Sequence, residues 1–275
     1  MLARALAALR DGTFRDYPIV VVDQSDAPYA AGAAGVTVVH DRGRGLSRAR
    51  NVGLATATTE WVAFVDDDCR PADDFAARLR SVLAEHPEAA LVAGDVPGDR
   101  AERDDYVQAS SFPVDRERWR RGRFTHPGRV AFGVLFAVRR EAARQLGGFD
   151  ERLGPGVPDF PAADDMDFNY RLLRSGLIAY QTPLLRAHHE QWRDPAALPA
   201  LHRGYLAAWA GFAIKHLRGG DVAGGLWLWS IGVVDVADMA ASALARRSRL
   251  RARIALAKLR GFVEGTVKGL RRRWP

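Results

Sequence analysis

Three consecutive aspartates, Asp66 to Asp68, are the residues in this sequence best suited to chemistry. They follow the apolar run Trp61–Val65, whose composition predicts a buried strand covered on both faces. Unpaired carboxylates are too costly to bury, so we expect them at the rim of a sheet, where open α/β folds bind ligands. Grouped carboxylates suit Mg²⁺ or Mn²⁺ shared with phosphate groups. A solvated acidic turn would look the same, so this run alone leaves both interpretations open.

Two later segments carry further reactive groups. A predicted helix over residues 163–176 begins with the acids Asp164, Asp165 and Asp167. Acids in a first turn also stabilise the helix dipole, so capping explains them equally well. After a predicted strand over 178–185, His188 and His189 stand in an expected loop, either as a metal or ligand site or as an ordinary surface pair.

A basic, glycine-rich loop over residues 42–53 leads into another predicted helix, with Ser47 as its N-cap. The start of a helix offers backbone N–H groups, and arginines bind anions well, so the segment suits an anionic ligand. The glycine spacing makes neither a Walker A loop nor a dinucleotide fingerprint.

The elements that must position these residues alternate between strand and helix. Predicted strands cover residues 18–22, 36–40, 61–65, 89–93, 130–138 and 178–185, and predicted helices 2–10, 73–85, 139–146 and 163–176. This alternation predicts an α/β fold with a parallel sheet. Residues 95–128 are polar and charged, and we expect a long loop region there.

The last quarter of the chain has a different character. Residues 224–244 are nearly apolar enough to cross a membrane, but Asp235 and Asp238 in their middle favour a packed or interfacial helix. Residues 246–273 hold eleven basic residues and one acid, a net charge of +10 against +7 for the whole chain. This basic amphipathic pattern predicts binding to an anionic membrane surface, with a solvated terminal helix as the alternative. Nucleic acid is disfavoured because no reading module accompanies the charge.

Several segments, taken in order, resemble the inverting family 2 glycosyltransferases. They are Val20–Asp26, Gly45–Gly53 with its Ala-Arg-Asn-x-Gly pattern, Phe64–Asp68 as a DXD motif, Gly147–Glu151, and Asp164–Asp165 with Arg171. The resemblance covers about residues 1–218. It implies an α/β GT-A fold with a Rossmann-like mixed sheet and a C-terminal helical extension. We therefore expect a glycosyltransferase domain over 1–203 and a helical, membrane-associating segment over 204–275.

The resemblance also implies roles on the donor side, for a nucleotide-sugar donor and Mn²⁺ or Mg²⁺. Asp23 would contact the base and Arg50 would lie near the nucleotide. Asp66 would contact the ribose or the metal, with Asp67 beside it in the donor site. Asp68 would hold the cation, and either His189 or His188 would lie near it.

On the acceptor side, the resemblance implies that Asp165 is the general base. Asp164, Gly148 and Arg171 would lie near the acceptor, a glycan or lipid-linked glycan. The family has Glu-Asp where this chain has Asp164–Asp165, so the expected base is retained.

The resemblance also implies a first strand before residues 2–10, and this sequence lacks it. We expect either a start further upstream or an incomplete donor pocket, and without that strand an internal sheet edge would be exposed. An upstream-extended chain is then expected to be more stable.

These expectations describe an inverting, metal-dependent enzyme of cell-surface polysaccharide synthesis. The single cysteine fits a reducing compartment, and the basic tail fits the inner face of the cell membrane. Two alternatives remain, namely a sugar nucleotidyltransferase and a catalytically degenerate scaffold of the same fold. The sugar, the acceptor and the oligomeric state are open.

Overall fold

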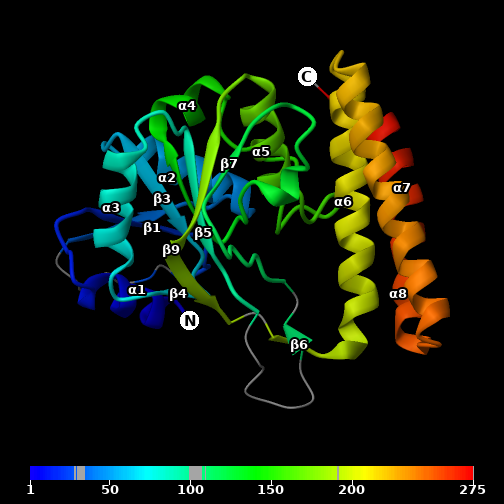
Figure 1. The fold of residues 1–275 in the computed structure, drawn as a ribbon, viewed down its shortest axis with the longest axis horizontal. Helices are drawn as coiled ribbons and strands as arrows, with labels where there is room; N and C mark the ends of the chain where they lie inside the picture. Colours follow the sequence, from blue (N-terminus) through cyan, green and yellow to red (C-terminus); the bar gives the residue numbers. More distant parts are fainter. Residues whose placement is uncertain (28, 30–34, 99–106, 109, 191, 275) are drawn as a thin grey trace. The chain divides into compact units, whose positions relative to one another are not determined.

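The computed structural model describes residues 1–27, 29, 35–98, 107–108, 110–190 and 192–274. The chain forms two compact units. Unit 1 comprises residues 1–44, 48–149 and 165–192, and unit 2 comprises 45–47, 150–164 and 193–275. Residues 99–106 and 109 of the expected loop region lie outside the described residues. Figure 1 traces the elements along the chain.

The central sheet of unit 1 is mixed and has the order β3-β8-β5-β9-β4, with β7 paired to β9. These strands are β3 (Trp61–Val65), β4 (Cys69–Pro71), β5 (Leu91–Asp95), β7 (Arg118–Arg120), β8 (Leu135–Arg139) and β9 (Ala179–His189). The mixed sheet confirms the GT-A expectation, whereas the parallel sheet inferred from strand-helix alternation was wrong. The reason is β8, which runs antiparallel to both of its neighbours, β3 and β5.

Strand β3 lies at the edge of this sheet, and its predicted coverage on both faces was wrong because none of its residues is fully buried. It pairs with β8 alone among the described strands, its Ala63 is exposed, and its other residues are half-buried. A separate two-stranded parallel sheet holds β1 (Ile19–Asp23) and β2 (Val36–His40), both outside the six-stranded sheet. The polar run after β3 therefore leaves an edge strand.

The core of unit 1 lies on both faces of the central sheet. Alternation along β8 sends Phe136 and Val138 into one cluster and Leu135 into the other. The first cluster includes residues of α4 (Arg140–Gln145) and α5 (Asp164–Arg174), and the second includes residues of α3 (Phe75–Glu85). Four further elements complete this part of the chain. Before β7 come the helices α1 (Leu2–Asp11) and α2 (Leu46–Thr56) and the short strand β6 (Val107–Gln108), and after β9 comes β10 (Trp192–Arg193).

Unit 2 contains three long helices side by side, α6 (Leu198–Arg218), α7 (Val222–Ala245) and α8 (Arg249–Arg271) (Figure 1). Helix α8 packs on α6 through glycines. A Cβ atom at Gly261 would lie 2.1 Å from the carbonyl oxygen of Arg203, and one at Gly265 would lie 2.1 Å from that of Ala207. Real side chains do not approach that closely, so only glycine permits this contact between the helix backbones.

We expect Gly265→Ala to lower the free energy of unfolding by about 2 kcal/mol, because the added methyl group must push α8 away from α6. Thermal unfolding followed by circular dichroism measures the effect. The matched control is Gly53→Ala in α2, where the added Cβ would meet Val22 at an ordinary 3.7 Å. Helix propensity should make that control neutral or stabilising by up to about 1 kcal/mol. Equal melting temperatures for the two variants would contradict the close packing.

Candidate active site

The Arg50 guanidinium, only 4% exposed, is the centre of the site in unit 1. Its Nη2 donates to the carbonyl oxygen of Gly133 at 2.7 Å and to Oδ1 of Asp66 at 3.3 Å. The guanidinium also lies 5.4 Å from the ring centre of Phe149. A buried cation needs such partners to offset its lost hydration. Helix α2 therefore fixes the first aspartate of the acidic run.

The same glycine connects this cation to Asp165. The N–H of Gly133 donates to Oδ2 of Asp165 at 2.9 Å, and the N–H of Met166 donates to Oδ1 at 2.8 Å. A Cβ atom at Gly133 would lie 3.0 Å from Arg50 and 3.2 Å from the Asp165 carboxylate. Just before the helix, Ala163 has a φ of 68°, a left-handed conformation that is uncommon for alanine. The expected base is thus held in one orientation, with Gly133 between it and Arg50.

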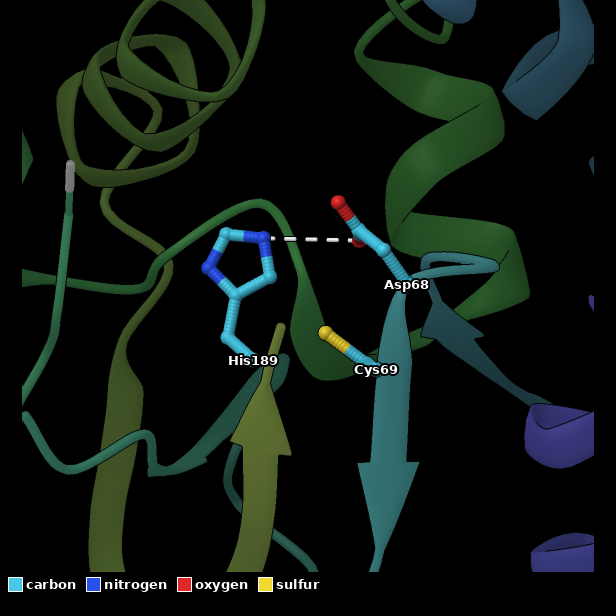
Figure 2. Close-up of side chains that lie close together, drawn as sticks. All are labelled: Asp68, Cys69 and His189. Carbon is cyan, nitrogen blue, oxygen red and sulfur yellow. Dashed lines mark ion pairs between the residues drawn. The ribbon is translucent and has the colours of Figure 1, made fainter. Parts of the chain in front are cut away.

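The acidic run itself forms a turn between β3 and β4. The N–H of Cys69 donates to the carbonyl oxygen of Asp66 at 3.0 Å, and Asp67 is exposed at the tip. Asp68 points to the imidazole of His189, with 3.4 Å between its Oδ1 and Nε2 (Figure 2). The N–H of Glu190 donates to the carbonyl oxygen of Asp68 at 2.9 Å, which ties this turn to the end of β9.

The two adjacent histidines lie in β9, not in the expected loop. In the pairing of β9 with β4, His189 is opposite Cys69 and His188 is opposite Arg70. Because successive side chains of a strand point to opposite faces, only one histidine can face Asp68. That residue is the buried His189, and the half-buried His188 belongs to the other face.

Cys69 is a site neighbour that the sequence reasoning missed. A ligand atom from each of Asp68, Cys69 and His189 lies within 4.8 Å of the others (Figure 2). Burial, reinforced by the charges of Asp66, Asp68 and Asp67, raises the pKa of the Cys69 thiol well above its usual range. A protonated thiol is a poor ligand, whereas a carboxylate and an imidazole suit a hard or borderline cation. The residues therefore fit Mn²⁺ or Mg²⁺ held by Asp68 and His189.

Asp23 lies at the carboxyl end of β1, in the smaller sheet. Its carboxylate accepts hydrogen bonds from the N–H groups of Tyr29 at 2.7 Å and Ser25 at 2.9 Å. These bonds, with a smaller contribution from His40 at 3.7 Å, lower the pKa of Asp23 to about 2. The carboxylate is ionised at neutral pH and is held by its own loop. The described contacts do not join it to the Arg50 network.

An ion pair between Arg48 and Asp41, near the carboxyl end of β1, was not predicted from the sequence. Arg48 of α2 donates from Nε to Oδ2 and from Nη2 to Oδ1 of the buried Asp41, both at 2.8 Å. This fork, with hydrogen bonds from Gly43 and Gln24, holds the pKa of Asp41 well below its usual range. The position of Asp41 directly after β2 is the feature of the sequence from which this pair could have been predicted.

The acceptor-side residues fall into two groups. Arg171 donates to the carbonyl oxygens of Leu146 at 2.6 Å and Gly148 at 2.8 Å, so it holds the turn after α4. Gly148 has a φ of 71°, and Asn51 exchanges two hydrogen bonds with the backbone of Phe149. The structure thus brings Arg171 and Gly148 together. Asp164, buried at the start of α5, belongs to unit 2 and lies against Gly154.

Comparison with known proteins adds to this geometry. A sequence model of glycosyl transferase family 2 matches residues 1–147. The pre-mycofactocin glycosyltransferases of two Mycobacterium tuberculosis strains are 29% identical to this chain over 226 residues. The match covers 74% of this chain and 44% of each relative, so the chain spans less than half the length of these relatives.

Solved structures share the fold. The mannosyltransferase PcManGT of Pyrobaculum calidifontis, solved with GDP-Man and Mn²⁺, has a TM-score of 0.57 at 17% identity, covering 98% of this chain and 83% of that one. GalNAc-T7, solved with UDP, GalNAc and Mn²⁺, has a TM-score of 0.51 at 17% identity, covering 78% of this chain and 47% of that one. At these identities the likeness shows the fold alone.

We expect Arg50→Gln to lower the free energy of unfolding by about 3 kcal/mol, because Asp66 loses its buried counter-charge and the Gly133 carbonyl loses its donor. Urea unfolding measures the change. Arg44→Gln is the matched control, since Arg44 pairs with Asp26 on the surface, where an ion pair contributes about 0.5 kcal/mol. If Arg50→Gln costs no more than the control, the guanidinium does not anchor the site.

Proposed function

The chain belongs to glycosyl transferase family 2, and on that premise we propose that it is an inverting, divalent-metal-dependent enzyme that transfers a sugar from a nucleotide-sugar donor to a hydroxyl group. That it is a glycosyltransferase follows from the family. The observation that carries the finer proposal is the connection from Asp66 through Arg50 and Gly133 to Asp165. This connection supports the proposal because it links an oriented carboxylate, through Gly133 and Arg50, to the turn that would hold a metal-bound diphosphate.

The donor side of the proposal rests on Asp68, His189 and Arg50. Asp68 and His189 would hold Mn²⁺ or Mg²⁺, with Asp66 directed to the ribose or metal and Asp67 nearby at the exposed tip. The bound cation would offset the negative charge that develops on the departing nucleoside diphosphate. The buried Arg50 of α2 adds a fixed positive charge next to this turn, through its hydrogen bond to Asp66. Asp23, ionised at the end of β1, would accept hydrogen bonds from the nucleotide base.

Transfer requires one proton acceptor. We assign this role to Asp165, whose carboxylate would take the proton of the acceptor hydroxyl as that oxygen attacks the anomeric carbon. The bond from the anomeric carbon to the diphosphate oxygen breaks, and its electron pair leaves with the nucleoside diphosphate. Attack from the face opposite the leaving group inverts the configuration. The N–H groups of Gly133 and Met166 would keep the base aimed during this step.

Two acceptor classes are proposed for testing. A glycan or lipid-linked glycan of the cell surface suits an enzyme held at the inner face of the cell membrane, as the basic segment 246–273 suggests. A pre-mycofactocin-like acceptor is the second, because relatives 29% identical to this chain carry that name. Asp164, Gly148 and Arg171 are assigned to the acceptor side, the last two through the turn that they form.

The first experiment is calorimetric titration of UDP, GDP and dTDP with and without Mn²⁺. We expect metal-dependent binding of one nucleotide, lost in Asp68→Ala and weakened about tenfold or more in His189→Ala. The matched control is His188→Ala, which should leave the affinity unchanged because His188 belongs to the other face of β9. Equal losses for the two histidine variants would contradict the proposed metal site. Equal nucleotide affinities with and without Mn²⁺ would contradict metal dependence.

A second experiment tests the base. We expect Asp165→Asn to reduce acceptor-dependent release of the nucleoside diphosphate by about 10²–10⁴-fold, because the amide cannot take the hydroxyl proton. Nucleotide affinity should stay close to the unmodified value, since asparagine keeps the size of Asp165 and an oxygen that can still accept a hydrogen bond from the backbone N–H groups of Gly133 or Met166. Asp74→Asn, a surface change in the turn before α3, is the control and should retain full activity. If the Asp165→Asn variant still transfers the sugar at the unmodified rate, Asp165 is not the base.

A further inference from the structure

Helix α8 carries an apolar stripe on its outward side. Its exposed residues Leu256, Leu259, Val263, Val267 and Leu270 recur at spacings of three and four residues, which places them on one face. The inward face is formed by buried glycines with Ile254, Phe262 and Lys258. A helix at the surface of a soluble protein normally turns polar residues outward. The outward apolar stripe therefore needs a covering partner.

Helix α7 shows the same feature. Val222, Leu226, Val233 and Leu244 are exposed at helical spacing, and Val234 lies beside them. The mid-helix acid Asp235 does not interrupt this surface, because the buried Nζ of Lys258 on α8 donates to both of its carboxylate oxygens, at 2.8 and 2.9 Å. One of the two acids in the middle of α7 is therefore paired with a cation of the neighbouring helix, whereas the other, Asp238, is exposed.

The concentration of apolar surface on these two helices is pronounced. Ten of the fourteen exposed large apolar side chains among the described residues lie on α7 and α8, five on each. The other four are distributed over the rest of the described chain. Exposed apolar residues concentrated in this way mark an interaction site, whereas single scattered ones do not.

Basic residues border the stripe on α8. Arg249, Arg253, Arg260 and Arg271 are exposed and lie along one flank of it. The turn before α8 adds the exposed Arg246 and Arg247. The only acid of α8, Glu264, is paired with Arg203 of α6 at 2.6 Å. An apolar stripe flanked by arginines complements a surface with acyl chains below and anionic headgroups above.

We propose that the outward faces of α7 and α8 together form a docking surface for an anionic lipid bilayer, with both helices lying in its interface. Among the described helices, α7 alone is long and apolar enough to cross a membrane. However, Arg260 lies midway along α8, which packs beside α7, and a spanning arrangement would carry it to the bilayer centre, where charge is costly. This surface goes beyond the catalytic proposal and does not depend on it.

The test is co-sedimentation of the full chain with vesicles of phosphatidylcholine alone or mixed with phosphatidylglycerol. We expect binding to the mixed vesicles that is at least about tenfold tighter than to the neutral ones and weakens as salt is added. Leu259→Glu combined with Val263→Glu should reduce binding about tenfold or more, since both residues lie in the stripe. The matched control is Phe124→Glu with Leu184→Glu, which adds the same charge at exposed apolar positions of unit 1.

A second pair of variants tests the charged flank. Arg253→Glu with Arg260→Glu should abolish the preference for phosphatidylglycerol, whereas Arg44→Glu with Arg116→Glu on unit 1 should not. All four double variants change exposed residues, so circular dichroism should show unchanged helix content. The proposal is overturned if both vesicle types bind equally, or if the Leu259 and Val263 variant binds like its control. It is also overturned if sedimentation velocity shows a dimer that this variant dissociates while vesicles fail to bind, since a second copy then covers the face.

Discussion

The burial of one cation, Arg50, is the constraint on which the site depends. A guanidinium removed from water must be given hydrogen-bond acceptors and, where available, an aromatic face. Arg50 finds them in Asp66, the carbonyl oxygen of Gly133 and the ring of Phe149, which come from three distant parts of the sequence. The acidic turn and the residue that holds Asp165 therefore share one anchor. Loss of Arg50 would therefore disturb the proposed metal site and the proposed base together.

Glycines make these close approaches possible. Gly133 lies between Arg50 and Asp165 where a Cβ atom would crowd both, and at Gly148 a Cβ would lie 2.5 Å from Asn51. The hydrogen bonds between Asn51 and the backbone of Phe149 join segments 98 residues apart. In the Ala-Arg-Asn-x-Gly pattern, then, the arginine and the asparagine act on the surrounding backbone. Both side chains position other parts of the site, Arg50 by holding Asp66 and Asn51 by holding the backbone of Phe149.

Local patterns were enough to predict most elements and the placement of the acidic run, because the composition of Trp61–Val65 and the cost of burying carboxylates are properties of neighbouring residues. The pairing of the strands, by contrast, does not follow from neighbouring residues alone. The antiparallel direction of β8, the edge position of β3 and the length of β9 depend on contacts that no single segment encodes. The choice between His188 and His189 followed only from the register of β9 on β4. Cys69 and Asp41 were missed because their roles come from neighbours brought near by folding.

Helix α8 shows why an amphipathic pattern alone does not say which face is covered. Its sequence offers apolar residues on one face and glycines on another, and a hydrophobic-inward rule would bury the leucines. The glycines set the packed face, because backbone-to-backbone contact with α6 at Gly261 and Gly265 leaves no room for a side chain at these two positions. Once this contact forms, the leucine stripe must point outward, and the arginines at its flank follow by helical spacing. Small residues thus select the packed face, and the helix keeps its apolar face for another surface.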